Sequence, residues 1–166
     1  MEKINSLTGM TDLIETKADE NVLANKVFQT EKILKEIFTN YAMSEIRTPA
    51  LENTNLFKIS VGDTSDIVNK ELYTFSDKND KSITLRPEGT ASVMRSIIEK
   101  KLDGETHKLW YLGPMWRYER PQKGRYRQFN QAGIEILGYP EGAPEFEMIS
   151  LICELNRKLQ IRKPLI

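Results

Sequence analysis

Cationic side chains crowd into one short segment of a chain whose charges otherwise balance. Residues 117–129 read RYERPQKGRYRQF, and Glu119 is the only acid among the cations Arg117, Arg120, Lys123, Arg125 and Arg127. The whole chain has 24 Lys and Arg residues against 24 Asp and Glu residues. Because the net charge is zero, attraction for an anion must come from a local cluster. Arginine forks suit phosphate oxygens, and Phe129 offers a flat face on which a nucleobase could stack.

This segment is predicted to be the loop of a hairpin between two strands, residues 107–119 and 127–138. Strand alternation places Arg117 and Glu119 opposite the apolar face of Trp110, Leu112, Pro114 and Trp116. On the return strand it separates Ala132, Ile134 and Ile136 from Arg127, Phe129, Gln131, Gly133 and Glu135. The apolar faces are expected to pack on helices, and the reverse side has the outline of a binding surface.

Two residues of that surface suggest a ligand. Gly133 leaves a gap through which a substrate could approach the backbone, and Glu135 is costly to bury between Ile134 and Ile136 unless a partner satisfies it. A solvated sheet face, with Phe129 in the core, explains the same pattern without any ligand. The pattern alone leaves both readings open.

A second cluster lies in TLRPEGTAS, residues 84–92, where Arg86, Glu88 and Thr90 occupy alternate positions. Pro-Glu-Gly predicts a turn from a strand into a helix, with Thr90 as the capping residue. Glu88 is the suspected site residue, because an acid beside a helix start can hold an ammonium group. A capped turn with no binding role is the alternative.

The remaining pattern predicts an α+β fold with an antiparallel sheet flanked by helices, in one domain. Helical spacing indicates helices over 21–41, 91–101 and 144–160, the last two with inward faces of Ala91, Met94, Ile98 and Leu102, and of Met148, Ile152, Leu155 and Leu159. Residues 45–57 are expected to be extended around Pro49, and strands are expected near 71–77 and 82–89.

Composition excludes several classes of site. A single cysteine, Cys153, expected to be a small buried hydrophobe, and a single histidine, His107, leave no disulfide framework and no zinc or other metal cluster. No signal peptide is recognisable, and no stretch approaches the roughly 20 apolar residues of a membrane helix. We therefore expect a cytoplasmic protein with no membrane partner.

At this point the motifs are recognisable. TLRPEGTA and LWYLGPMWRYERPQKGRYRQFNQAGIEILG resemble the catalytic core of the histidyl-tRNA synthetase family, class II aminoacyl-tRNA synthetases. The longer block resembles motif 2 of that class, and the first helix followed by RTPALENTNLF, with Pro49, resembles motif 1. GMTDL resembles the family's N-terminal strand entry without its usual arginine, and Ala42-Met43 replaces the usual Gly-Tyr.

The resemblance implies an ATP site and a histidine site. ATP is a substrate, with Mg²⁺ on its phosphates. Arg117 would be the catalytic residue at the α-phosphate, Arg125 would hold the outer phosphates, and Phe129 would stack on adenine with Glu119 near its amine. The implied histidine-binding residues are Glu88, Gly89, Thr90, Arg117, Gln131 and Glu135, of which Glu135 would accept a hydrogen bond from the imidazole.

The resemblance also implies larger partners. The loop 120–126 would touch the acceptor end of tRNA(His) through Arg120, Gln122 and Lys123, and the motif 1 region, residues 21–58, would form a homodimer. The family continues with motif 3 and an anticodon-binding domain, which are absent from these 166 residues. Residues 1–166 are therefore expected to be the N-terminal portion of the catalytic core, with impaired activity.

Two other interpretations stay open beside a synthetase core. The first is a synthetase-like, histidine-sensing regulatory subunit of ATP phosphoribosyltransferase, which would not charge tRNA. The second is a folding or dimerisation module with an empty pocket. The intact Arg117, Arg125 and Phe129 argue against the regulatory subunit. Binding of ATP would distinguish a synthetase core from the regulatory subunit.

Overall fold

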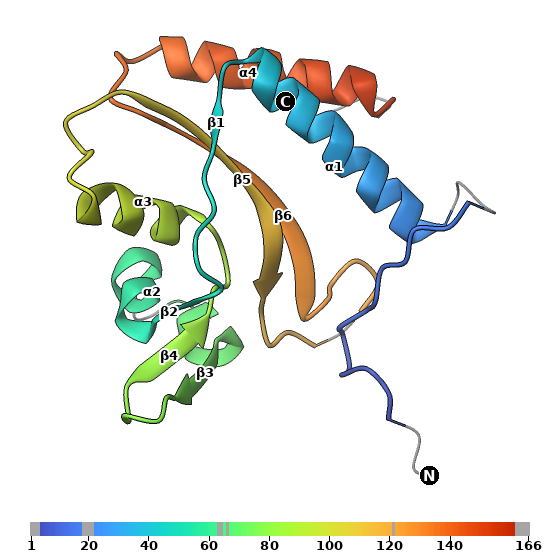
Figure 1. Ribbon diagram of the computed structural model, residues 1–166, viewed down its shortest axis with the longest axis vertical. Helices are drawn as coiled ribbons and strands as arrows, with labels where there is room; N and C mark the ends of the chain where they lie inside the picture. The colour runs from blue at the N-terminus through green and yellow to red at the C-terminus, as the bar shows by residue number, and fades with distance from the viewer. Residues whose placement is uncertain (1–3, 18–21, 63–64, 66, 121, 162–166) are drawn as a thin grey trace. The chain divides into compact units, whose positions relative to one another are not determined.

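The computed structural model describes residues 4–17, 22–62, 65, 67–120 and 122–161 (Figure 1). The chain divides into two compact units, which are described separately. The first unit comprises Met1–Asp12, Ile46–Leu102 and Tyr111–Gly133, and the second comprises Leu13–Glu45, Asp103–Trp110 and Ile134–Ile166. The Asn21 end of the first predicted helix, Pro121 in the predicted loop and residues 162–166 lie outside the described residues.

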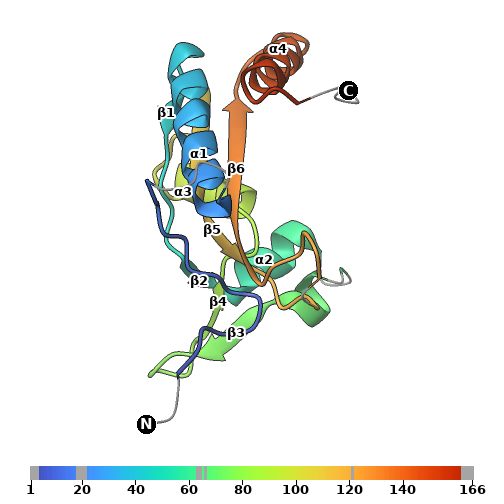
Figure 2. The same cartoon turned by 90° about the vertical axis from the view of Figure 1, so that its right-hand side faces the viewer.

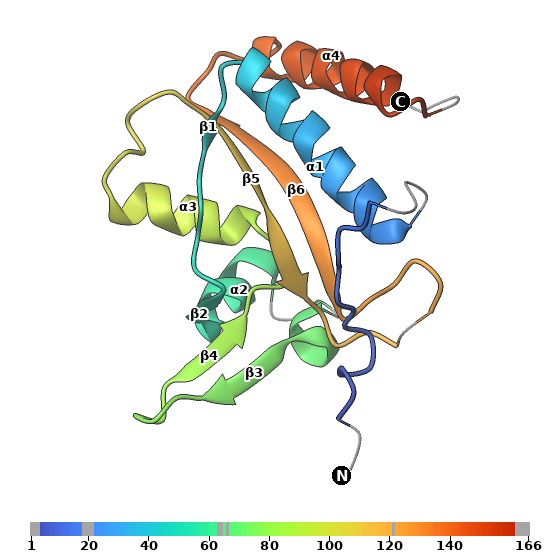
Figure 3. The same cartoon turned by 45° about the vertical axis from the view of Figure 1, so that its right-hand side comes forward.

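The first unit is built on a small antiparallel sheet of order β2-β4-β3. Its strands are β2 (Leu51–Asn53), β3 (Tyr73–Ser76) and β4 (Ser82–Leu85), and Figure 3 shows β3 and β4 joined by a short turn. Hydroxyl groups run across it, because Thr84 Oγ1 lies 2.8 Å from Thr54 Oγ1 and 3.0 Å from Thr74 Oγ1. Since Thr84 is fully buried, these bonds satisfy a polar group that would otherwise be costly there.

Helices cover this sheet. They are α2 (Thr54–Val61), the π-helix η1 (Ile67–Glu71) and α3 (Thr90–Glu99). Phe57 of α2, Val93 of α3 and Met115 are fully buried and form the centre of the unit's core. This core anchors the start of α3, where the candidate site residues lie.

The prediction of an extended segment over 45–57 is wrong in its second half. Strand β2 ends at Asn53, whose side chain accepts a hydrogen bond from the Asn55 N–H at 2.9 Å and so caps α2. Pro49 disfavours helix only for the residue before it, and the helix begins five residues later. A capping asparagine therefore decides where the extended segment ends.

The second unit contains α1 (Leu23–Asn40), β1 (Ser44–Glu45) and α4 (Ala143–Lys158). Helices α1 and α4 pack against each other (Figure 1), and Lys158 of α4 pairs with Glu36 of α1 at 2.6 Å. The ring of Phe38 stacks on Trp110 with centroids 5.1 Å apart. Lys108 forms an ion pair with Glu147.

The long hairpin matches the sequence prediction closely. Strands β5 (His107–Trp116) and β6 (Gln128–Leu137) run antiparallel, as Figure 2 shows, in a sheet of order β1-β5-β6, and β1 pairs with β5 in parallel. His107 opens β5, as expected of a strand-entry residue. With antiparallel pairing in both sheets and helices outside them, the predicted α+β class is confirmed.

The predicted apolar faces of the hairpin need correction. Met115 and Tyr111 are buried although they lie on the supposed binding face, and Trp116 is only half-buried. On β6, Ala132 is exposed and Ile134 is half-buried. Trp110 is buried on one face of β5, and Tyr111 and Met115 are buried on the other, so both faces of this strand are packed. Strand β6 lies at the edge of the described sheet.

Two predicted helix faces also differ. Ile98 of α3 is 62% exposed, whereas Ser92 and Ser96 are buried. In α4 the buried residue is Leu151, and both Met148 and Ile152 are exposed. Cys153, on the same helix, is exposed rather than buried. Helical periodicity found these helices, but it did not identify which side of each one meets the core.

Candidate active site

Arg117 lies at the end of β5 in the first unit, where it contacts both predicted clusters. Its Nε donates a hydrogen bond to the Pro87 carbonyl oxygen at 3.0 Å, and its guanidinium carbon lies 5.3 Å from the ring centroid of Phe129. The Arg117 N–H also bonds the Arg127 carbonyl at 3.0 Å, which sets the register of the hairpin. The structure therefore joins the turn before α3, the end of β5 and the start of β6 around one guanidinium.

Gln131 lies two residues after Phe129 on β6, and its side-chain oxygen carries a chemical signal. This oxygen is buried and has no hydrogen-bond partner among the described residues. Leaving a buried acceptor unsatisfied costs about 1–3 kcal/mol. A ligand that donates a hydrogen bond would remove that cost, so the position fits a residue that contacts substrate.

Glu119 and Arg125 contact each other across the hairpin loop. Glu119 Oε2 lies 3.3 Å from Arg125 Nη1. This buried oxygen accepts no hydrogen bond from the described residues. The Arg125 side chain is 63% exposed, so this ion pair is worth about 1 kcal/mol or less. The exposed Arg125 guanidinium is therefore accessible to an anion such as a phosphate.

The tip of the loop is exposed. Arg120, Gln122 and Lys123 all face solvent, and Gly124 has φ +82°, a conformation that favours glycine. The backbones of Gln122 and Arg125 bond each other at 2.9 Å, which closes the tip. The predicted tRNA-contacting side chains are therefore accessible to a large partner.

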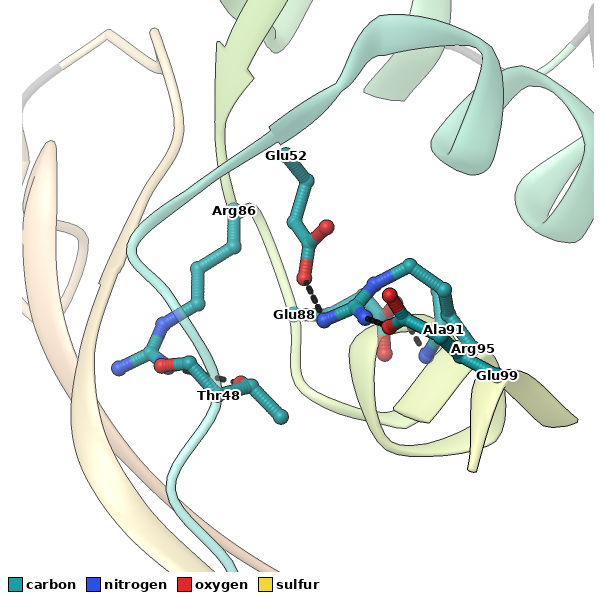
Figure 4. A network of polar contacts seen from close by, with 7 residues as sticks. All are labelled: Thr48, Glu52, Arg86, Glu88, Ala91, Arg95 and Glu99. Atoms are coloured by element: carbon teal, nitrogen blue, oxygen red, sulfur yellow. Dashed lines mark hydrogen bonds and ion pairs between the residues drawn. The ribbon is translucent and has the colours of Figure 1, made fainter. Parts of the chain in front are cut away.

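The 88–90 turn is built differently from the prediction. Thr90 does not cap α3, because it is itself the first helical residue. The carboxylate of Glu88 accepts hydrogen bonds from the N–H groups of Thr90 at 2.6 Å and Ala91 at 3.0 Å. Figure 4 shows Glu88 and Ala91. Gly89 is buried, Thr90 is exposed, and Glu88 is half-buried. Glu88 and Thr90 also line a groove of about 1100 Å³ beside α2 and α3.

The gap predicted at Gly133 is filled from within the chain. A Cβ added at Gly133 would lie 2.2 Å from Cζ and Oη of Tyr111, and one added at Gly89 would lie 2.3 Å from the same ring. The two glycines thus make room for the buried Tyr111 rather than for a substrate. Neither strand alternation nor turn chemistry indicated this contact, because Tyr111 is distant from both glycines in sequence.

Glu135 belongs to the second unit, where it is half-buried in β6. It already takes part in an interaction within the chain. Its predicted contact with an imidazole stays a prediction.

Two further arginines form hydrogen bonds and ion pairs within the first unit (Figure 4). Arg86 bonds Thr48, and burial lowers the pKa of its guanidinium. Arg95 bonds Glu52 at 2.7 Å and Glu99 at 2.6 Å, and the hydrogen bond to Glu52 raises the pKa of Arg95. Sequence reasoning noted Arg86 only for its spacing and did not identify Arg95.

The described part of the chain contains neither a cluster of metal ligands nor a membrane-spanning helix. No group of three or more His, Cys, Asp and Glu side chains gathers there in a way that could hold a metal ion. Nor is any helix described there long and apolar enough to cross a bilayer.

Comparisons with known proteins agree on one family. A family model described as histidyl-tRNA synthetase matches residues 20–166. A histidine–tRNA ligase of Desulfitobacterium hafniense (strain DSM 10664 / DCB-2) is 53% identical over 134 residues, covering 80% of this chain and 32% of that protein. One of Geobacter sulfurreducens is 50% identical over 136 residues, covering 81% and 33%. The chain spans about a third of the length of these curated relatives.

Solved structures give the same picture. Apo S. aureus histidyl-tRNA synthetase has a TM-score of 0.74 and 37% identity, with 94% of this chain and 35% of that chain covered. A Bacillus halodurans protein described as an ATP phosphoribosyltransferase regulatory subunit/histidyl-tRNA synthetase has a TM-score of 0.71 at 22% identity, covering 98% and 40%. The second likeness concerns the fold alone.

Proposed function

The chain belongs to the histidyl-tRNA synthetase family, and from that premise we propose that its first unit provides part of a site in which ATP activates histidine. The observation that carries the proposal is the position of Arg117. Its guanidinium lies over Phe129 and is tied to Pro87, next to Glu88. A cation and an aromatic face meet there beside the turn that carries Glu88, so that three segments come together.

In the proposed reaction, a carboxylate oxygen of histidine attacks the α-phosphorus of ATP. The bond to the β-phosphate breaks, and histidyl-adenylate and pyrophosphate form. Arg117 would neutralise the charge that develops on the α-phosphate, while Phe129 stacks on adenine. Glu119 would lie near the adenine amine. Arg125 would release Glu119 and bind the outer phosphates. No protein nucleophile is required, since positioning and charge neutralisation carry such a step.

Histidine would be held by the 88–90 turn and by β6. Glu88, Gly89 and Thr90 would bind its amino group, and the unsatisfied oxygen of Gln131 supports a hydrogen-bond donor beside them. Glu135 would accept a hydrogen bond from the imidazole, so that a different amino acid would leave the Glu135 carboxylate unpaired.

The second step would transfer the histidyl group to the terminal ribose of tRNA(His). The exposed cations Arg120 and Lys123, with Gln122, support a contact to its acceptor end. A homodimer through residues 21–58 is part of the same proposal, and Mg²⁺ would enter with ATP. Because the chain spans about a third of its relatives, adenylate formation is expected to be slow.

Isothermal titration with ATP and histidine-dependent pyrophosphate exchange test the proposal. We expect weak ATP binding and slow exchange, both strongly reduced but still measurable in Arg117→Ala. The control is Lys78→Ala, which removes an exposed cation from the β3–β4 turn and should change neither. Histidine binding without ATP binding would overturn the proposal in favour of a regulatory protein.

A further inference from the structure

Arg86 is a half-buried guanidinium that the proposed reaction does not use. Its Nη1 donates to the Thr48 carbonyl oxygen at 2.8 Å and to Thr48 Oγ1 at 3.0 Å, and its Nε donates to the Pro114 carbonyl oxygen at 3.2 Å. These three hydrogen-bond partners are all neutral. Burying a cation among neutral acceptors is unfavourable unless its hydrogen bonds are well formed, and burial lowers the pKa of Arg86 accordingly.

The backbone of Arg86 is fixed as firmly as its side chain. Its N–H donates to the Ala50 carbonyl at 3.0 Å, and its carbonyl accepts from the Trp116 N–H at 3.1 Å. Trp116 directly precedes Arg117. Arg86 therefore holds three segments at one point: residues 48–50, the start of the 86–90 turn and the end of β5.

The next residue connects this point to the candidate active site. Pro87 is fully buried, and its carbonyl accepts the hydrogen bond from Arg117 Nε at 3.0 Å. Pro87 has no N–H to add a bond of its own, so Arg86 and the capping carboxylate of Glu88 fix the turn on either side of it. The Pro87 carbonyl, which holds the Arg117 guanidinium, thus lies between two residues fixed by hydrogen bonds, Arg86 and Glu88.

We propose that Arg86 is a positioning residue, which acts through the Pro87 carbonyl to hold the guanidinium of Arg117 where the reaction needs it. The inference deepens, and rests on, the proposed activation of histidine. This positioning role requires an arginine. The planar guanidinium donates hydrogen bonds to Thr48 and Pro114 in two directions, which the ammonium group of a lysine does not. Gly113 makes room for the fork, since a Cβ there would lie 2.9 Å from Arg86 Nη2.

The first test is a double-mutant cycle on the full chain. We expect Arg86→Lys to lower kcat for adenylate formation about 10- to 100-fold, with a smaller change in KM for ATP, since small misplacements of a reacting group have effects of this size. In an Arg117→Ala background, Arg86→Lys should cause no further loss. Losses that multiply in the double variant would overturn the proposal.

The second test does not depend on activity. In ¹⁵N-labelled protein, Arg86→Lys should shift the Nε–H signal of Arg117 and speed its exchange with solvent. The Nε–H of Arg127, which donates to the Glu119 carbonyl at 3.1 Å, is the internal reference and should stay unchanged. An unchanged Arg117 signal in a folded Arg86→Lys protein would overturn the proposal.

Arg95→Lys is the matched control, because Arg95 belongs to the same unit but bonds Glu52 and Glu99 instead. It should leave the Arg117 signal in place, and an equal shift there would also overturn the proposal. If Arg86→Lys does not fold, Gly113→Ala displaces the same guanidinium by contact and is judged by the same signal. If the unaltered chain forms no adenylate, the proposed function fails while the spectra still decide the role of Arg86.

Discussion

At the scale of residues, the site depends on contacts between segments that turn chemistry and strand pairing bring together. The backbone bond between Arg117 and Arg127 fixes the hairpin register, so Phe129, two residues further on, comes to lie by the Arg117 guanidinium. A shift of one residue would turn Phe129 to the other face of the sheet. The contact of the Arg117 guanidinium with the Phe129 ring is therefore a consequence of register.

Tyr111 imposes a second constraint on single residues, and Gly133→Ala tests it. The new Cβ would lie 2.2 Å from Cζ and Oη of Tyr111. We expect the free energy of unfolding to fall by about 1–3 kcal/mol, as for other overpacked cores. Urea denaturation measures the change.

Gly104→Ala is the control for this prediction, because nothing lies within 4 Å of a Cβ added there. It should leave the unfolding midpoint almost unchanged. A Gly133→Ala protein as stable as the Gly104→Ala protein would show that Tyr111 does not occupy the space beside β6. Partial recovery in a Gly133→Ala, Tyr111→Leu double variant would identify the ring as the obstacle.

At the scale of elements, a helix or strand was predictable where its sequence signal extends over many residues. Long helices and the hairpin were predictable because their periodicity repeats over many residues. Helix α2 was missed because it is short and follows Pro49 closely, and only Asn53 signals its start. The cap of α3 was assigned to Thr90 rather than Glu88 because either side chain is suited to the role.

The candidate site was predictable where its residues follow a strand pattern, and it was not predictable where they meet through contacts between distant segments. Alternation along β6 placed Phe129 and Gln131 correctly on one strand face. The contact of Tyr111 with Gly89 and Gly133 joins three separate segments, and the Arg86 hydrogen bonds join two more. Sequence periodicity carries no information on such long-range contacts.

Helix α2 allows a direct test of capping at this scale. Asn53→Ala removes the side chain that accepts the Asn55 N–H, and we expect unfolding to become easier by about 1 kcal/mol. Asn53→Asp keeps an acceptor oxygen and should cost much less. Thermal and urea unfolding of both variants provide the measurement, and equal losses in the two would rule out the hydrogen bond as the cause.

At the scale of the whole molecule, the net charge is zero, so attraction for an anion depends on local clusters of charge. A neutral chain does not attract a polyanion over long distances, so affinity for RNA must come from the exposed cations of the hairpin loop. If the proposed contact with tRNA is right, we expect an RNA hairpin that mimics an acceptor stem to bind with a salt dependence set by that loop. Replacing both Arg120 and Lys123 with alanine should lower the slope of log K against log salt by about 2.

The β3–β4 turn supplies a control of equal charge. Lys78 and Lys81 are exposed there, and replacing both with alanine gives the same net charge as the loop variant. Fluorescence anisotropy of a labelled RNA hairpin, measured from low to moderate salt, should show the change in slope for the loop variant alone. If both variants weaken binding equally, the attraction comes from overall charge, and the loop has no special role in holding RNA. If only the loop variant does so, the cations that crowd residues 117–127 act on RNA as a local cluster.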